Sequence, residues 1–364
     1  MRKKETTVPV SAPDRVPCAE PPHISVVIPT TGRPAAVARC LASLTAVAYP
    51  SWDIQLVDQS DDTRTEAVAR RLAPRLPGLT YRHLAVRGAA RARNWAMARA
   101  RGEIVAFLDD DCTVPADWLE RVWRAFRRHP DAALIFGAVS AAPHNPTTHY
   151  IPAFAPRGER RLRGSLAFLS CEAMSASLAV RRAAIRGIGP VDEQTGAGAR
   201  LAGEDRDYTY RALRAGQTVV ETEAIRVTHY GARAYATGDA SRLVRRAAFA
   251  QGALDMKALR TGDPAAVIFI LAHLGQCLGR IDACHLLMRR RPSNAAWIVL
   301  YVRGLVASLA YGVRRDTQLW VGPREETPPR PAVPAYERDR RRSGHRPWSA
   351  RTDRRHGRDD VSSG

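Results

Sequence analysis

Short apolar runs and longer amphipathic segments take turns along the first part of the chain. The apolar runs, which predict buried strands, cover residues 24–29, 53–58, 79–86, 103–108 and 133–140. Between them, apolar residues recur at helical spacing over residues 33–47, 63–73, 89–100 and 115–129. The apolar face of the first such helix is formed by Val37, Cys40, Leu41, Leu44 and Val47. Alternating strands and helices predict an α/β fold, with a mostly parallel sheet flanked by helices.

The regular alternation weakens after about residue 140. Residues 175–182 predict an antiparallel strand, and residues 204–216 predict a helix that ends at Gly216. A glycine-rich loop lies between them, and residues 217–231 form an extended segment or a pair of strands. Ligands bind beyond the carboxyl ends of parallel strands. The strand ends expected at the site are Pro29–Arg33, Asp58–Asp62 and Asp109–Asp111.

Two apolar stretches, residues 264–279 and 294–313, follow in the C-terminal part. The first is shorter than the ~20 residues that span a bilayer. The second carries Arg303 near its middle, which costs ~2.5–3.5 kcal/mol at the centre of a membrane helix. We therefore favour helices that pack on the protein body or lie in a membrane interface over helices that span the membrane. At an interface, Arg289–Arg291 would lie near anionic headgroups.

These patterns divide the chain into four parts. A flexible, proline-rich leader (1–22) precedes the α/β domain (23–235), and a helical region (236–322) is followed by a disordered basic tail (323–364). The leader has no apolar segment typical of a secretory signal, and the six cysteines form no CxxC pair. Both features favour a cytoplasmic protein with reduced thiols.

The chain contains 56 Lys and Arg against 36 Asp and Glu, which gives a formal net charge of +20. This excess favours anionic partners, which include nucleotide phosphates, nucleic acid and anionic membrane surfaces. Nucleic acid is disfavoured because the sequence has neither zinc-finger spacing nor a stacking-aromatic pattern. A P-loop ATPase and a dinucleotide oxidoreductase are disfavoured because there is no Walker loop and no GxGxxG after a strand.

In this basic chain, three acids stand together in the stretch FLDDDC, residues 107–112. Adjacent carboxylates repel, and a divalent cation that prefers oxygen ligands, Mg²⁺ or Mn²⁺, relieves the repulsion. Strand alternation would point Asp109 and Asp111 to one side and Asp110 to the other. The alternative is an acidic turn that leads into the next helix, because Asp favours turns.

Further positions could carry chemistry, each with a structural alternative. Asp58 follows a strand and could accept a hydrogen bond from a nucleobase N–H, or cap a turn. Glu204 and Asp205 open a helix, where acids stabilise the N-terminus, and a carboxylate there could also deprotonate a hydroxyl nucleophile. His229 ends an extended segment and is either structural or a metal ligand.

Six segments, taken in order, resemble the family 2 glycosyltransferases of the GT-A (Rossmann-like) fold. They are SVVIPTTGRPAAVARCLASL, IQLVDQSDD, AARARNWAMARARGEIVAFLDDD, MSASLAVRRAAI, GPVDEQTGAGARLAGEDRDYTYRALRAG and THYG, which together cover about Ile24 to Gly231. The resemblance implies an inverting sugar transfer from a nucleoside-diphosphate sugar to an acceptor hydroxyl, with Mn²⁺ or Mg²⁺ as cofactor.

The resemblance also implies roles for single residues. The donor-binding residues are Pro29, Thr30, Arg33, Asp58, Arg93, Asn94, Asp109 and Asp110. Within this set, Asp58 would bind the base and Asp109 the ribose. The metal ligands on the diphosphate are Asp111 and His229, and the catalytic acids are Glu204 and Asp205, with Asp205 as the general base. The loop 196–203 would close over the donor.

Two departures from the family pattern limit what is implied. Thr31-Gly32 stands where an aromatic residue and Asn are usual, and the Gln-x-x-Arg-Trp signature of processive polysaccharide synthases is missing. We therefore expect a single transfer, to a glycan, a lipid-linked acceptor or a small molecule. The expected location is the cytoplasm, with peripheral contact to the inner membrane face through residues 264–313. The alternatives are a catalytically silent GT-A-like binding or scaffold protein and a nucleotidyltransferase-like enzyme.

Overall fold

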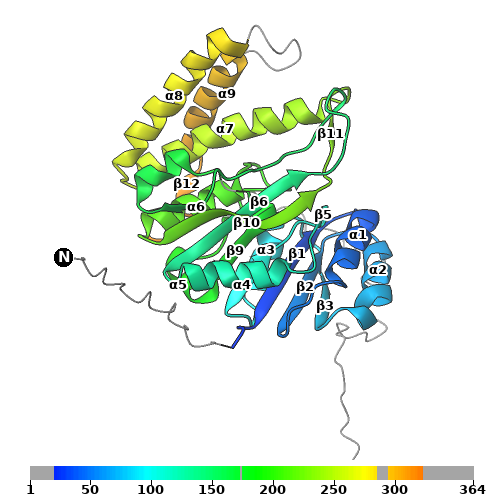
Figure 1. Cartoon of the computed structure of the whole chain (residues 1–364). Helices are drawn as coiled ribbons and strands as arrows, with labels where there is room; N and C mark the ends of the chain where they lie inside the picture. The colour runs from blue at the N-terminus through cyan, green and yellow to red at the C-terminus, as the bar shows by residue number, and fades with distance from the viewer. Residues whose placement is uncertain (1–19, 173, 285–293, 323–364) are drawn as a thin grey trace, which may run out of the picture.

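The computed structural model describes residues 20–172, 174–284 and 294–322 (Figure 1). Most of the expected leader (1–22), the whole basic tail (323–364) and Arg289–Arg291 therefore lie outside the described residues.

Strands and helices alternate from residue 24 to residue 141, as predicted. The strands are β1 (Ile24–Thr30), β2 (Trp52–Asp58), β3 (Leu79–His83), β4 (Ile104–Phe107), β5 (Cys112–Thr113), β6 (Ala132–Ala141), β7 (His149–Tyr150), β8 (Arg160–Leu162), β9 (Leu178–Arg181), β10 (Thr218–His229), β11 (Arg233–Ala234), β12 (Gly312–Val313) and β13 (Trp320–Val321). The α-helices are α1 (Pro34–Leu44), α2 (Arg64–Leu72), α3 (Ala89–Met97), α4 (Trp118–Arg128), α5 (Arg182–Ile188), α6 (Glu204–Arg214), α7 (Asp239–Arg260), α8 (Ala265–Cys284) and α9 (Asn294–Ala307). The 3₁₀ turns are η1 (Ala73–Arg75), η2 (Ser165–Ser170), η3 (Ser175–Ser177) and η4 (Ser308–Ala310).

The main sheet has the strand order β3-β2-β1-β4-β9-β6-β10-β5, and β8 pairs with β10 (Figure 1). β3, β2, β1 and β4 run parallel, so their carboxyl ends meet at one edge. β9 is antiparallel to both of its neighbours, as predicted for residues 175–182. Residues 217–231 contain one long strand, β10, whose register against β6 shifts between Thr222 and Arg226. The predicted α/β fold is confirmed, with a parallel first half and a mixed second half of the sheet.

The helices bury the faces that their apolar spacing predicts. The buried apolar residues of α1 are Val37, Cys40, Leu41 and Leu44, while Val47 beyond its end is half-buried. Pro34 occupies the first turn of α1, where no intrahelical partner exists for a backbone N–H. Because α1 begins at Pro34, only a short turn separates it from the end of β1 at Thr30. Residues Pro29–Arg33 therefore stay at the carboxyl ends of the parallel strands.

Three C-terminal helices pack together, and α8 and α9 stand side by side on α7, away from the central sheet (Figure 1). The approach of α7 to α9 is close because each helix offers a glycine to the other's backbone. A Cβ on Gly252 would overlap the carbonyl oxygen of Tyr301, and a Cβ on Gly304 would overlap that of Phe249. Among the described residues, none of the helices combines the length and hydrophobicity needed to cross a membrane.

Replacing Gly304 by alanine is expected to lower the free energy of unfolding by about 1–3 kcal/mol, because the added methyl forces the two backbones apart. Urea unfolding followed by circular dichroism measures the change. Gly275→Ala on α8 is the matched control, since a Cβ there meets nothing within 4 Å. Equal stability of the Gly304→Ala and Gly275→Ala proteins would contradict the close contact.

Candidate active site

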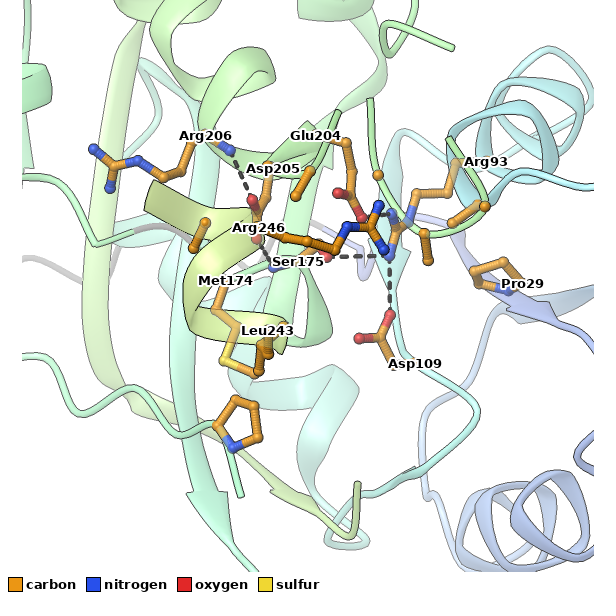
Figure 2. A pocket seen from close by; sticks show the side chains of 18 of the residues that line it. Pro29, Arg93, Asp109, Met174, Ser175, Glu204, Asp205, Arg206, Leu243 and Arg246 are labelled. Atoms are coloured by element: carbon orange, nitrogen blue, oxygen red, sulfur yellow. Dashed lines mark hydrogen bonds and ion pairs between the residues drawn. The ribbon is translucent and has the colours of Figure 1, made fainter. Parts of the chain in front are cut away.

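A cavity of about 740 Å³ opens where the carboxyl ends of β1 and β4 meet the start of α6 and one side of α7 (Figure 2). The predicted site residues that line it are Pro29, Thr30, Arg33, Arg93, Asp109, Asp110, Asp111, Glu204, Asp205 and His229. The parallel half of the sheet explains their meeting, because residues that follow β1 and β4 emerge at the same edge.

The three acids after β4 lie in a turn, so strand alternation does not govern their directions. The prediction that Asp110 faces away from Asp111 is wrong, since both carboxylates meet the same side chain. Arg33 reaches Asp110 at 2.5 Å and Asp111 at 2.7 Å. Asp109 instead pairs with Arg93 at 3.0 Å.

The three carboxylates differ in how readily they ionise. Burial raises the pKa of Asp110 to about 7, although Arg33 and the hydroxyl of Thr30 oppose the shift. Burial also acts on Asp111, but the hydrogen bond with His229 and the charge of Arg33 outweigh it and hold its pKa at about 2. Asp111 is therefore ionised at neutral pH, which a cation ligand requires.

Asp111 meets His229 across the end of β10. The Nε2 atom of His229 lies 3.3 Å from Oδ1 of Asp111, and Nδ1 lies 2.9 Å from the carbonyl oxygen of Pro152. Because that carbonyl can only accept, Nδ1 carries a proton and Nε2 faces the carboxylate. A histidine held by its other ring nitrogen in this way is the usual arrangement of a metal ligand.

Gly231 lies directly against these two side chains. A Cβ at this position would lie 2.5 Å from Nε2 of His229 and 2.7 Å from Oδ2 of Asp111. A methyl at this position would therefore crowd the ligand atoms of Asp111 and His229, which lie close enough together to share one cation. Cys112 also lies within 4.8 Å of both ligand atoms. Burial raises the pKa of its thiol, which disfavours the thiolate as a ligand.

Arg93 joins three elements beneath the cavity. Its side chain is almost fully buried and donates to Glu204 at 2.8 Å, to Asp109 at 3.0 Å and to the hydroxyl of Ser175 at 3.1 Å (Figure 2). A buried guanidinium needs acceptors, and these three serve both of its terminal nitrogens. Arg93 thereby fixes the start of α6 relative to the acidic turn.

Asp205 lines the cavity from the first turn of α6. Gly203 precedes this helix with a φ of 81°, which a residue with a side chain rarely adopts. One carboxylate oxygen of Asp205 accepts the N–H of Arg206 at 2.8 Å, and the other accepts the N–H of Ser175 at 3.2 Å (Figure 2). Burial raises the pKa of Asp205 to about 6, and the charge of Glu204 acts in the same direction. A carboxylate with this pKa is suited to accept a proton near neutral pH.

Two predicted donor-binding residues do not reach the cavity. The carboxylate of Asp58 is fully buried, where it accepts from Ser60 and from the hydroxyl of Tyr81 at 2.8 Å. Asn94 binds both the N–H and the carbonyl of Val191, each at 2.8 Å, which fastens the segment that leads to α6. Both residues therefore shape the site's walls, and Gln59, the neighbour of Asp58, lines the cavity instead.

One wall of the cavity comes from α7, which the motifs did not indicate. Its lining residues are Leu243, Arg246, Ala247, Ala250, Gln251 and Leu254. Arg246 points into the cavity and also donates to the carbonyl oxygen of Ala199 at 3.0 Å (Figure 2). The N–H of Ala89 holds the carbonyl oxygen of Ala197 at 2.9 Å, so the glycine-rich loop bridges α3 and α7 beside the cavity.

A family model, glycosyl transferase family 2, matches residues 25–189. Glycosyltransferase AglE of Haloferax volcanii is 31% identical over 108 residues, which are 28% of this chain and 34% of that protein. Succinoglycan biosynthesis protein ExoM of Rhizobium meliloti is 33% identical over 142 residues, 38% of this chain and 43% of that protein. The chain thus matches less than half the length of these curated relatives.

Among solved structures, the chain is similar to the mannosyltransferase PcManGT from Pyrobaculum calidifontis in complex with GDP-Man and Mn²⁺. The TM-score is 0.50 at 20% sequence identity, and the match covers 79% of this chain and 86% of that chain. This likeness confirms the predicted GT-A fold.

Proposed function

Because residues 25–189 match the model of glycosyl transferase family 2, we propose that the chain is a metal-dependent inverting glycosyltransferase. It moves one sugar from a nucleoside-diphosphate sugar to an acceptor hydroxyl and does not polymerise it. One observation carries the proposal. A single cavity combines a cation corner at Asp111, His229 and Gly231 with an available carboxylate at Asp205.

Asp111 and His229 are the residues that would hold Mn²⁺ or Mg²⁺ on the donor diphosphate. When bound, the cation stabilises the negative charge that develops on the departing nucleoside diphosphate. Arg33 supports the same corner, since it neutralises Asp110 and Asp111. Arg93 holds Asp109 toward the cavity, where it can contact the donor ribose.

Asp205 accepts the proton of the acceptor hydroxyl while that oxygen forms a bond to the anomeric carbon. The bond from this carbon to the diphosphate oxygen breaks on the opposite face, so the sugar's configuration inverts, as in other single displacements at a sugar carbon. Glu204 is not the base, because Arg93 binds its carboxylate at 2.8 Å. Instead, Glu204 and Arg93 hold the start of α6 in place for Asp205.

The acceptor approaches Asp205 from the α7 side of the cavity, where Leu243, Arg246 and Gln251 face the open space. Single transfer is supported by the missing Gln-x-x-Arg-Trp signature. The proposal keeps the expected cytoplasmic location and the peripheral contact with the inner membrane face through residues 264–313.

The turnover number is expected to fall as the pH drops through about 6, by tenfold per unit below it, because Asp205 must be ionised to act as base. Protonation of His229 would also oppose cation binding at acid pH, since the hydrogen bond with Asp111 outweighs burial and raises its pKa. Initial rates measured at saturating Mn²⁺ separate the two effects, because excess metal displaces the proton from His229 and not from Asp205. A rate that stays constant between pH 7.5 and pH 5 would contradict the role of Asp205.

A thermal-shift screen of nucleoside diphosphates and nucleotide sugars, with and without Mn²⁺, tests the proposed donor class. GDP-mannose, the donor in the PcManGT complex, is one probe, and UDP and dTDP sugars are others. A donor at 100 times its Kd stabilises the fold by about 2.7 kcal/mol. We expect one nucleotide to raise the Tm with Mn²⁺, and the rise to disappear with EDTA. A screen in which none of the nucleotides shifts the Tm would contradict the proposal.

A further inference from the structure

α8 and α9 turn apolar side chains to solvent. Val267, Ile268 and Leu271 of α8 and Val299, Val302 and Val306 of α9 are all exposed, and Leu271 is 64% and Val306 61% exposed. Their spacing of three to four residues places them on the outward side of each helix, opposite the buried Phe269 and Tyr301. A grouping of exposed aliphatic side chains on a helix pair indicates an interaction surface.

The charge of this segment favours an anionic partner. Residues 264–313 contain five arginines and one acid, Asp282. On α9, Arg303 is exposed next to Val302 and one turn from Val299. Aliphatic side chains together with an excess of arginines over acids are typical of helices that lie on anionic bilayers. A second copy of the chain fits less well, because two-fold pairing would bring the same basic segments together.

The inward side of the same helices is tied to the cavity wall. Asp255 of α7 is fully buried and accepts from Tyr301 of α9 at 2.6 Å, from His273 of α8 at 2.7 Å and from Gln251 at 2.9 Å. Gln251 in turn accepts from the side chain of Arg206 at 2.8 Å. These contacts hold α8 and α9 in a fixed orientation relative to α6.

The backbone N–H of Arg206 is one of the two N–H groups that bind Asp205. The buried contacts of Asp255 join α8 and α9 to the segment that carries Asp205. A partner that binds α8 and α9 therefore also sets the orientation of the cavity relative to that partner. The inward sides of α8 and α9 pack on α7, and α7 lines the side of the cavity from which the acceptor approaches in the proposed reaction.

We propose that the outward face of α8 and α9 docks on a bilayer rich in anionic lipids, and that the docked enzyme uses an acceptor held at that membrane. The docking itself stands on the exposed side chains and the charge of the segment. The statement about the acceptor rests on the proposed function.

Vesicle co-sedimentation of the full chain tests the docking. We expect binding to vesicles of phosphatidylglycerol and phosphatidylcholine and weak binding to phosphatidylcholine alone. The double variant Leu271→Asp/Val302→Asp should bind the anionic vesicles roughly tenfold or more weakly. Two apolar side chains that would insert into the bilayer are replaced by carboxylates, which the anionic lipids repel. Val86→Asp is the matched control, since Val86 is also exposed but lies after β3, at the far end of the sheet. It should bind as the unchanged protein does.

Three results would overturn the proposal: no binding of the unchanged protein to anionic vesicles, unaltered binding by the double variant, or a dimer in size-exclusion chromatography that the double variant converts to a monomer. The last result would show that a second copy covers the face. The Mn²⁺-dependent thermal shift with nucleotide is measured on the same samples. Because the double variant should keep that shift, failure of docking and failure of the proposed function are separate outcomes.

Discussion

Replacing Asp205 by asparagine is expected to lower the kcat of sugar transfer by roughly 10²–10⁴-fold, because the variant cannot accept the acceptor's proton. Asparagine has nearly the same size, and its oxygen can still accept the N–H of Arg206 that Asp205 accepts at 2.8 Å. The variant loses only the longer hydrogen bond from the N–H of Ser175, at 3.2 Å, because an amide NH₂ cannot accept. Donor affinity in the presence of Mn²⁺ should therefore stay within about threefold of the unchanged protein, which marks the loss as one of transition-state stabilisation.

The matched control is Asp117→Asn, which makes the same chemical change at the start of another helix. Asp117 precedes α4, is exposed and pairs with Arg121. Its variant should transfer sugar at the normal rate. Transfer by the Asp205→Asn protein within tenfold of the normal rate would remove Asp205 from the mechanism, since proton transfer by a positioned side chain contributes at least about 10²-fold.

Replacing Gly231 by alanine is expected to weaken the apparent affinity for Mn²⁺ by about 10–100-fold or more, the range seen when the surroundings of a metal site are disturbed. The new methyl would stand 2.5 Å from Nε2 of His229 and 2.7 Å from Oδ2 of Asp111, against the two side chains that we propose hold the cation. Donor binding that depends on the metal should weaken with it. A Mn²⁺ titration at fixed donor concentration, followed by donor fluorescence or calorimetry, measures the effect.

Gly275→Ala is the control for this change, since its added methyl meets nothing within 4 Å. Both alanine variants should keep native secondary structure, because neither glycine has a positive φ. If the Gly231→Ala protein needs no more Mn²⁺ than the control, the cation does not bind between Asp111 and His229.

The residues at strand ends were predictable because local pattern determines the topology that brings them together. Alternating apolar and amphipathic segments require parallel strands, and parallel strands deliver Pro29, Thr30 and the acids after β4 to one edge. The short stretch FLDDDC thus indicated the acidic side of the cavity, where we propose that the cation binds. Its internal geometry was not predictable, since the acids leave the strand and enter a turn.

The roles of Asp58 and of α7 depend on contacts between segments far apart in the chain. The hydroxyl of Tyr81 on β3 donates a hydrogen bond to the carboxylate of Asp58 at the end of β2. This contact exists only because β2 pairs with β3. The position of α7 along the cavity depends on its close packing against α9 at Gly252. A helical pattern alone does not say which surface a helix covers. Such long-range packing has no signal in a single sequence.

The most direct test of the central claim is a calorimetric titration of the full chain with the nucleotide sugar that the thermal-shift screen selects. With Mn²⁺ present we predict one donor per chain, and we predict that binding weakens at least tenfold when EDTA removes the metal, because the diphosphate would then meet Asp111 without a cation between them. Donor binding of equal strength with and without Mn²⁺ would contradict a metal-dependent glycosyltransferase site at this cavity.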